Sequence, residues 1–145
     1  MKKPTIIDGT AVQAETVIRW LKAEFESGLS GGGFYQNRSI IRRAARNSEF
    51  KCYVSGRTVV GFTVFTLGSS RFAIDILEIR QKYRGVGYGQ AFAMEVIKML
   101  FNGGASHIEV ECAPTSSEAF WRKLGFISME SRYSSMGNPK LMLRA

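Results

Sequence analysis

One segment constrains the fold of this chain more than any other: a strand pattern at 72–80 that runs through closely spaced glycines into a helix pattern. The connecting segment contains Arg84, Gly85, Val86, Gly87, Tyr88, Gly89 and Gln90. Glycines in such a turn let backbone N–H groups approach an anion, and the N-terminus of the following helix adds partial positive charge. The pattern predicts either a phosphate-binding turn or an ordinary tight connection. Gln90 stands where a dinucleotide-binding fingerprint has its third glycine.

Hydrophobic periodicity predicts the remaining elements. Helices are predicted from Thr10 to Gly28, over 37–47, behind the glycine turn to Asn102, and over 115–125. Strands are predicted at 6–7, 50–55, 58–67, 72–80, 107–112, 126–131 and 140–143. Thr10 with Gln13, and Thr115 with Glu118, fit capping boxes, and a glycine-rich connection is expected at 27–33. This order predicts one mixed α/β domain over residues 1–145.

Residue counts exclude several kinds of protein. Cys52 and Cys112 are the two cysteines and His107 is the single histidine, so we expect no metal site and no disulfide framework. The longest uncharged run, Thr58–Ser70, contains two glycines and is too short to span a membrane. We therefore expect a soluble, cytoplasmic protein, monomeric or homodimeric, that does not associate with membranes.

Two motifs together resemble the GNAT superfamily of acetyl-CoA-dependent N-acetyltransferases. Leu77–Gly89 is similar to its acetyl-CoA-binding motif, a strand followed by Arg/Gln-x-x-Gly-x-Gly/Ala and a helix, and matches at Arg84, Gly87 and Gly89. Ala119–Phe126 is similar to its second motif, a short helix that ends in Leu-Gly-Phe. The resemblance implies a mixed, mostly antiparallel sheet with a splayed central parallel strand pair, flanked by helices.

The same resemblance implies where acetyl-CoA would bind. Its diphosphate would lie on the backbone of Arg84–Gln90, and its pantetheine arm would pair with the strand edge near Leu77 and Ile79. Trp121 stands where the family usually has a tyrosine, and we assign it to the cofactor site. A mainly structural role in packing is the alternative for Trp121. The implied reaction is acetyl transfer to a primary amine without a metal ion.

Acetyl transfer to an amine near pH 7 requires a base, because a lysine-like amine has a pKa of about 10.4. Asp75 is the first choice for this base, since it stands among apolar residues where burial would raise its pKa. Glu78 is the second choice, and Glu109 or Glu111 the third. For a general acid the indole of Trp121 is unsuited, which leaves Tyr133 as the candidate. Unaided departure of the thiolate and binding of acyl-CoA without turnover are the alternatives.

Positive charge concentrates in two stretches of the chain. Residues 36–57 hold six basic residues and one acidic residue, and residues 122–145 hold five basic residues and one acidic residue. Arg38, Arg42 and Arg46 are spaced four apart and form one stripe on the predicted second helix. The stripe is either a solvated helix face or a site for an anionic acceptor, such as an acidic protein, a small molecule or an aminoacyl-tRNA. A basic nucleic-acid-binding module and a CoA-binding pseudoenzyme, neither with acetyl transfer, are the alternative functions.

Overall fold

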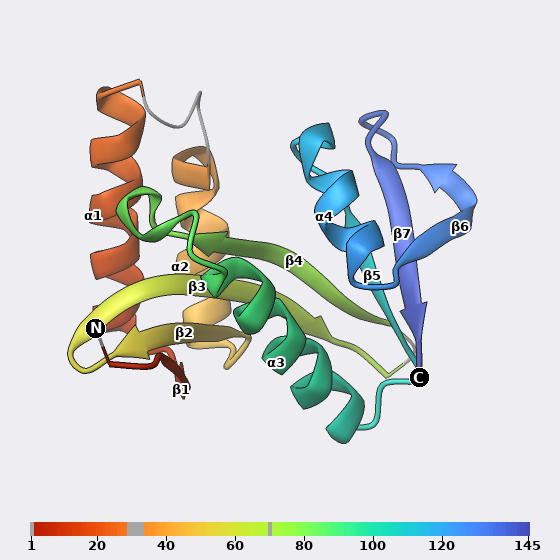
Figure 1. Ribbon diagram of the computed structural model, residues 1–145, viewed down its shortest axis with the longest axis horizontal. Helices are drawn as coiled ribbons and strands as arrows, with labels where there is room; N and C mark the ends of the chain where they lie inside the picture. The colour runs from red at the N-terminus through yellow and green to blue at the C-terminus, as the bar shows by residue number, and fades with distance from the viewer. Residues whose placement is uncertain (1, 29–33, 70) are drawn as a thin grey trace. The chain divides into compact units, whose positions relative to one another are not determined.

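The strands form one sheet in the order β1-β2-β3-β4-β5-β7-β6 (Figure 1). The computed structural model describes residues 2–28, 34–69 and 71–145. The strands are β1 (Thr5–Asp8), β2 (Phe50–Ser55), β3 (Thr58–Leu67), β4 (Phe72–Ile79), β5 (His107–Glu111), β6 (Ile127–Tyr133) and β7 (Pro139–Arg144). The α-helices are α1 (Ala11–Glu26), α2 (Arg38–Arg46), α3 (Tyr88–Asn102) and α4 (Glu118–Lys123). The predicted order of helices and strands is confirmed.

Most of the strand pairs are antiparallel. The pairs β1–β2, β2–β3, β5–β7 and β6–β7 run antiparallel, and β4 and β5 run parallel. The register of the parallel pair joins only Ala73 with Glu109 and Ile74 with Val110, although β4 runs on to Ile79. The predicted mixed sheet with a central parallel pair is therefore confirmed.

Contacts divide the chain into two compact units. Unit 1 comprises Met1–Phe65 and Ile76–Phe92, and unit 2 comprises Thr66–Asp75 and Ala93–Ala145. The single domain expected over residues 1–145 stays a prediction. Within the predicted glycine-rich connection, residues 29–33 lie outside the described residues.

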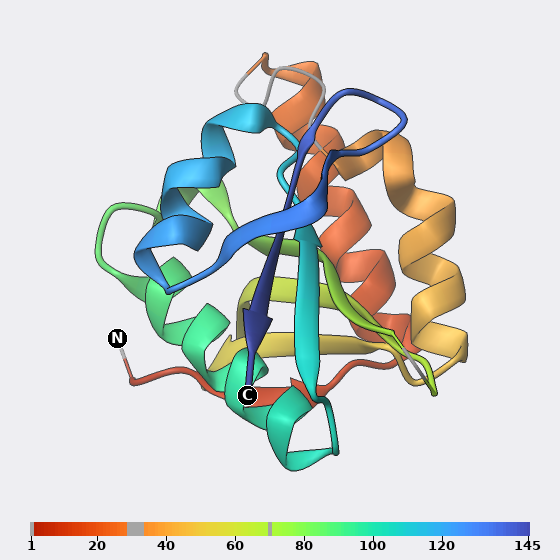
Figure 2. The same cartoon turned by 90° about the vertical axis from the view of Figure 1, so that its right-hand side faces the viewer.

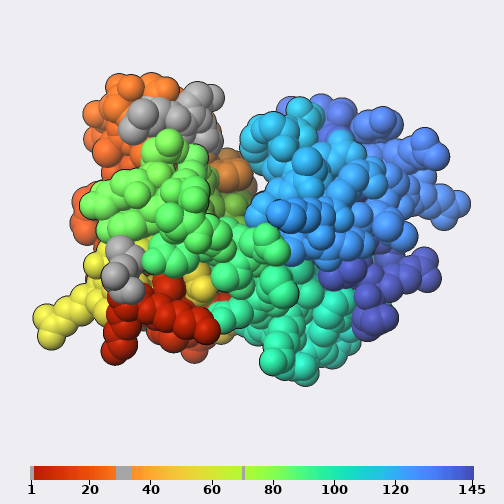
Figure 3. All heavy atoms as spheres, viewed as in Figure 1, coloured from red at the N-terminus to blue at the C-terminus, as the bar shows by residue number. Residues whose placement is uncertain are grey.

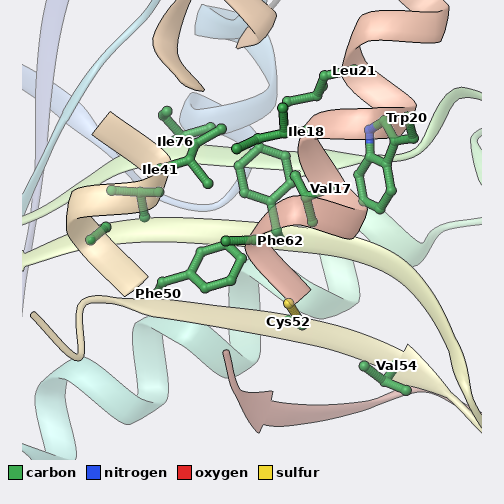
Figure 4. Packing of buried hydrophobic residues seen from close by; sticks show 13 residues of the cluster. Val17, Ile18, Trp20, Leu21, Ile41, Phe50, Cys52, Val54, Phe62 and Ile76 are labelled. Atoms are coloured by element: carbon green, nitrogen blue, oxygen red, sulfur yellow. The ribbon is translucent and has the colours of Figure 1, made fainter. Parts of the chain in front are cut away.

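The core of unit 1 lies where α1 and α2 pack side by side against the sheet (Figure 1). Its side chains come from α1, α2, β2, β3 and β4 and meet around Phe62, whose ring centroid is 5.8 Å from that of Trp20 (Figure 4). Successive strand residues point to opposite faces. Cys52 accordingly joins this core, whereas its neighbour Tyr53 stacks on Phe92 of α3 with ring centroids 4.6 Å apart.

Unit 2 has its own core beneath α4. Strand β7 lies between β5 and β6 in the sheet, and Figure 2 shows β7 in dark blue beside β5 in cyan. The buried side chains include Ile108, Val110 and Leu141 from β5 and β7. Trp121 of α4 meets Phe126 edge-on with ring centroids 5.3 Å apart. The apolar pattern of the second motif is thus used in packing.

One of the two predicted capping boxes is confirmed and the other is wrong. The Thr10 amide donates to Gln13 Oε1 at 2.8 Å and begins α1 as expected. The box expected at Thr115 and Glu118 does not form, because Thr115–Ser117 folds as a 3₁₀ turn and α4 begins only at Glu118. The Ser117 amide closes that turn on the Pro114 carbonyl at 2.9 Å. None of the helices in the described ranges is long and apolar enough to cross a membrane.

Candidate active site

The turn between β4 and α3 requires glycine because of its backbone conformation. Gly85 and Gly87 have φ values of +84° and +89°, in a region that residues with a side chain rarely adopt. A Cβ atom built on either residue meets nothing within 4 Å, so crowding does not explain these glycines. Residues 84–87 are exposed, and the green surface of Figure 3 shows this part of unit 1 open to solvent. The backbone of the turn is therefore accessible.

The first turn of α3 adds hydrogen-bond donors to this surface. The Ala91 amide donates to the Gly87 carbonyl at 3.2 Å and closes the first helical turn. The Gly89 and Gln90 amides, which precede it in the first turn, face no carbonyl of the helix itself. The positive end of the helix dipole lies at the same place. The turn can therefore accept an anion by backbone donors alone.

The Arg84 side chain links the glycine turn to the end of β4 and to Gln81. Its Nε donates to the Ile79 carbonyl at 2.8 Å, its Nη1 donates to Gln81 Oε1 at 2.5 Å, and its Nη2 forms an ion pair with Glu78. Of the two strand residues predicted to contact the pantetheine arm, Ile79 is buried and Leu77 is half-buried. The guanidinium of Arg84 thus fixes the end of β4 to the start of the glycine turn.

Glu78 is a largely buried carboxyl beside that guanidinium. Its side chain is 10% exposed. The pKa of Glu78 is raised to about 7: burial is the main cause, the cation of Arg84 opposes it, and the charge of Glu24 adds to it. The second carboxyl oxygen, Oε2, is buried and finds no hydrogen-bond partner among the described residues. At neutral pH this group can therefore accept or release a proton.

Glu24 is the acid of this region that we did not predict. It lies on α1, is 6% exposed, and its Oε1 accepts the Gln81 amide at 2.7 Å. The sequence does contain a signal for it, because Glu24 continues the apolar face of α1 marked by Val17 and Leu21. An acid on the buried face of a helix needs a partner, and here the partner is the turn that follows β4.

The burial expected for Asp75 is wrong. Strand alternation places its side chain on the face opposite to buried Ile74 and Ile76. Asp75 is exposed, and its Oδ2 accepts the Thr66 hydroxyl at 2.6 Å. Asp75 therefore lacks the desolvation that favoured it as a base.

Glu109 and Glu111, the third choice for the base, lie on β5, and their partners favour the ionised form. Burial alone would raise the pKa of Glu109, but His107 Nε2 and Arg71 Nε, each 3.1 Å from a carboxylate oxygen, bring the pKa below its usual value. Asn138 and Ser134 each donate to Glu111 Oε2 at 2.8 Å, and these hydrogen bonds lower its pKa. Both carboxylates are consequently weak bases.

Trp121 and Tyr133, assigned to the cofactor and to the general acid, both lie in unit 2. Trp121 is buried against Phe126, whereas Tyr133 is 64% exposed at the end of β6. Cys112 is buried, and burial raises the pKa of its thiol. Across residues 2–28, 34–69 and 71–145, no group of three or more His, Cys, Asp and Glu side chains could hold a metal ion.

The predicted arginine stripe is divided between paired and unpaired residues. Arg42 makes a two-pronged ion pair with Glu15 of α1, with nitrogen–oxygen distances of 2.9 and 3.0 Å. The Arg38 guanidinium lies 4.6 Å from the ring centroid of Tyr35 and donates to its carbonyl. Arg43 and Arg46 are exposed and have no ion-pair partner in the described part of the chain. The free charge of α2 is therefore concentrated at its C-terminal end.

Acetyltransferases are among the solved structures that this chain resembles in fold. The PaiA N-acetyltransferase from Thermoplasma acidophilum, crystallised with coenzyme A, matches with a TM-score of 0.77 and 12% identity over 99% of each chain. An acetyltransferase from Thermus thermophilus matches with a TM-score of 0.75 and 16% identity over 99% of this chain and 97% of that one. Ard1 from Thermoplasma volcanium matches with a TM-score of 0.75 and 18% identity over 98% of this chain and 97% of that one. No curated protein matches the sequence.

The sequence itself matches a family profile. The profile described as the acetyltransferase (GNAT) family covers residues 14–126, from the first turns of α1 through the Leu-Gly-Phe motif. It spans the glycine turn, whose open backbone suits the acetyl-CoA co-substrate expected from the sequence. The chain therefore belongs to the acetyltransferase (GNAT) family and is an acetyl-CoA-dependent N-acetyltransferase.

Proposed function

We propose that this enzyme transfers the acetyl group directly from acetyl-CoA to a primary amine, with Glu78 as the base. The observation that carries this proposal is the buried Glu78 carboxyl, whose pKa is raised to about 7. A base is most effective when its pKa lies near the working pH. Glu78 takes a proton from the ammonium form of the acceptor. The free amine attacks the thioester carbon, the C–S bond breaks, and the second proton lost by the nitrogen is balanced by protonation of the departing sulfur, so coenzyme A leaves as its thiol.

The glycine turn would hold the cofactor during this reaction. Its support is the accessible backbone of Arg84–Gln90, with two residues in the left-handed region. The diphosphate would accept hydrogen bonds from these amides, and the pantetheine arm would follow β4 near Leu77 and Ile79. Because the Arg84 side chain is bound to Glu78 and to the end of β4, cofactor recognition rests on the backbone of the turn.

The leaving thiol needs only modest help, since a free thiol has a pKa of about 8.5. Tyr133 is the proposed proton donor, because its phenol is exposed at the end of β6. A Tyr133→Phe variant then loses rate in the chemical step while acetyl-CoA affinity is kept. Trp121 remains assigned to the cofactor site as a prediction, beside its observed packing against Phe126.

The acceptor is proposed to be anionic. Its support is the unpaired charge of Arg43 and Arg46 at the end of α2, whereas Arg42 is already compensated by Glu15. Acidic proteins, acidic small molecules and aminoacyl-tRNA share this chemistry. An Arg46→Glu variant should therefore lose acceptor affinity, seen as a higher KM for the acceptor, and keep its acetyl-CoA affinity. Arg57→Glu, in the exposed β2–β3 turn, is the matched control.

Glu78→Gln tests the base beside Asp75→Asn, which removes the rival acid on the same strand. Glu26→Gln, at an exposed acid of α1, is the matched control. Thiol release from acetyl-CoA is followed with an acceptor found by mass spectrometry after incubation with a cell extract. We expect Glu78→Gln to lose about 10²- to 10⁴-fold in kcat/KM, with a much smaller change in coenzyme A affinity by calorimetry. Full activity in Glu78→Gln would refute the assignment. Coenzyme A binding without thiol release by the wild type, with every acceptor tried, would instead indicate a pseudoenzyme.

A further inference from the structure

Glu24 is an acid where the fold of unit 1 calls for an apolar residue. Val17, Trp20 and Leu21 of the same helix face are all buried in the core against β3 and β4 (Figure 4). Glu24 continues this face one turn further and is itself 6% exposed. A carboxylate in such a place loses its hydration, which is costly unless the group has partners. Its presence therefore calls for a specific interaction.

The first interaction is with the turn after β4. Glu24 Oε1 accepts the Gln81 amide at 2.7 Å. The Gln81 side chain in turn accepts a hydrogen bond from Arg84 at 2.5 Å, and the Gln81 carbonyl accepts one from the Arg84 amide at 3.2 Å. Glu24 thus attaches the segment before the glycine turn to α1 through the Gln81 amide.

The second interaction is with the Glu78 carboxyl. Both acids use Oε1 for their hydrogen bonds, and the Oε2 atom of each is buried without a partner among the described residues. The charge of Glu24 acts on Glu78 and opposes its ionisation. The nearby cations are Arg84, paired with Glu78, and Arg80, whose guanidinium lies 5.8 Å from the ring centroid of Trp20. The Arg84 guanidinium thus bonds directly to Glu78, whereas the printed partner of Glu24 is the Gln81 amide, so the charge of Glu24 has no directly bonded cation among the described residues.

We propose that Glu24 is a positioning residue, which anchors the turn at Gln81 and disfavours negative charge on Glu78. The proposal rests on the proposed function, in which Glu78 is the base. The anchoring requires only an acceptor oxygen, which a glutamine would also supply. The effect on Glu78 requires the negative charge of Glu24, which a glutamine would not supply. The two roles can therefore be separated by substitution.

The decisive variant is Glu24→Gln, because it keeps the shape and the acceptor oxygen and removes the charge. Glu26→Gln is the matched control, since Glu26 lies two residues further along α1 and is exposed beside Lys22. The first readout is a carbon-13 NMR titration of glutamate carboxyl groups, in which Glu78→Gln identifies the Glu78 signal. The second readout is the pH dependence of kcat/KM. We expect Glu24→Gln to move both the Glu78 titration and the rising limb of kcat/KM to lower pH, and Glu26→Gln to move neither.

The outcomes separate the two proposals. An unmoved Glu78 titration in Glu24→Gln would overturn the inference about Glu24, whatever the activity. A Glu78 titration that moves while the limb of kcat/KM stays in place would overturn Glu78 as the base and leave the coupling standing.

The anchoring role is tested by Glu24→Leu, which has no acceptor for the Gln81 amide. We expect this variant to bind coenzyme A more weakly than Glu24→Gln in calorimetry. Equal affinities in the two variants would overturn the anchoring role. Should Glu24→Leu fail to fold, amide hydrogen exchange at Gln81 in the wild type and in Glu24→Gln decides the same point. Slow exchange in both is expected, and exchange in the wild type at the rate of an unstructured amide overturns the anchoring role.

Discussion

Gly87→Ala measures how much the backbone conformation of the glycine turn contributes to stability and to the proposed binding of the cofactor diphosphate. Replacing it by alanine places a Cβ atom on a residue with φ of +89°. Because that atom meets nothing within 4 Å, no steric clash adds to the cost. The expected loss in free energy of unfolding is the backbone term alone, about 1–2 kcal/mol. For a chain of 145 residues this corresponds to a decrease in Tm of roughly 3–8 °C.

The matched control is Gly56→Ala in the β2–β3 turn. Gly56 has φ of +60° and is equally open, so its replacement carries a similar backbone cost. If the diphosphate binds the amides of the β4–α3 turn, only Gly87→Ala also weakens coenzyme A binding. A rotation of one peptide that removes one such hydrogen bond corresponds to a Kd about tenfold higher. Gly87→Asn should recover part of both losses, because asparagine tolerates the left-handed region.

Thermal unfolding gives the stability of these variants, and calorimetry with coenzyme A gives their affinity. Two results would refute the reasoning. Equal coenzyme A affinity in Gly87→Ala, Gly56→Ala and wild type would show that the turn does not hold the diphosphate. An unchanged Tm in Gly87→Ala would show that the backbone conformation of the turn carries no strain for a residue with a side chain.

Three further predictions concern the core and the Glu78 carboxyl. Phe62→Ala empties the centre of the unit 1 core, where Phe62 is 0% exposed, and should cost about 3–5 kcal/mol in urea unfolding. Arg84→Met removes the cation that lowers the pKa of Glu78, so the rising limb of kcat/KM should move to higher pH. Glu78 has a pKa of about 7 in the fold and an ordinary value of 4.5, so its burial costs stability progressively as pH rises through this interval. The free energy of unfolding of Glu78→Gln relative to the wild type should consequently rise between pH 5 and pH 8. Chemical denaturation should show a rise of at most about 3 kcal/mol. An equal difference in stability at both pH values would contradict this.

The elements of the fold were predictable because each depends on a local pattern. The hairpin strands at 50–55 and 58–67 have the expected bounds, since alternating apolar residues and the turn at Gly56 act over short distances. The capping box predicted at Thr115 does not form, and the reason is also local. A 3₁₀ turn closed on the Pro114 carbonyl takes up 115–117, and no periodicity distinguishes it from a first helical turn.

The properties of charged residues were less predictable because they depend on distant partners. Arg42 appeared to be one of three equivalent arginines on a stripe, but Glu15 compensates it from 27 positions away. Asp75 appeared buried because its neighbours are apolar, whereas strand alternation places it on the other face. Burial of the neighbours along a strand is therefore weak evidence for burial of the residue between them.

Glu24 and Glu78 show which information a single sequence lacks. Each acid stands at an apolar position of its own element, so the sequence marks both as exceptions. Their meeting depends on the packing of α1 against β4, two elements that lie far apart along the chain. Once they meet, the ionisation of Glu78 and the conformation of the glycine turn become linked, because Arg84 bonds to Glu78 and to Gln81 while Glu24 bonds to the Gln81 amide. Protonation of Glu78 weakens its pairing with Arg84 and thereby loosens one of the contacts that hold the turn, so the acid proposed as the base also affects the segment proposed to bind the cofactor.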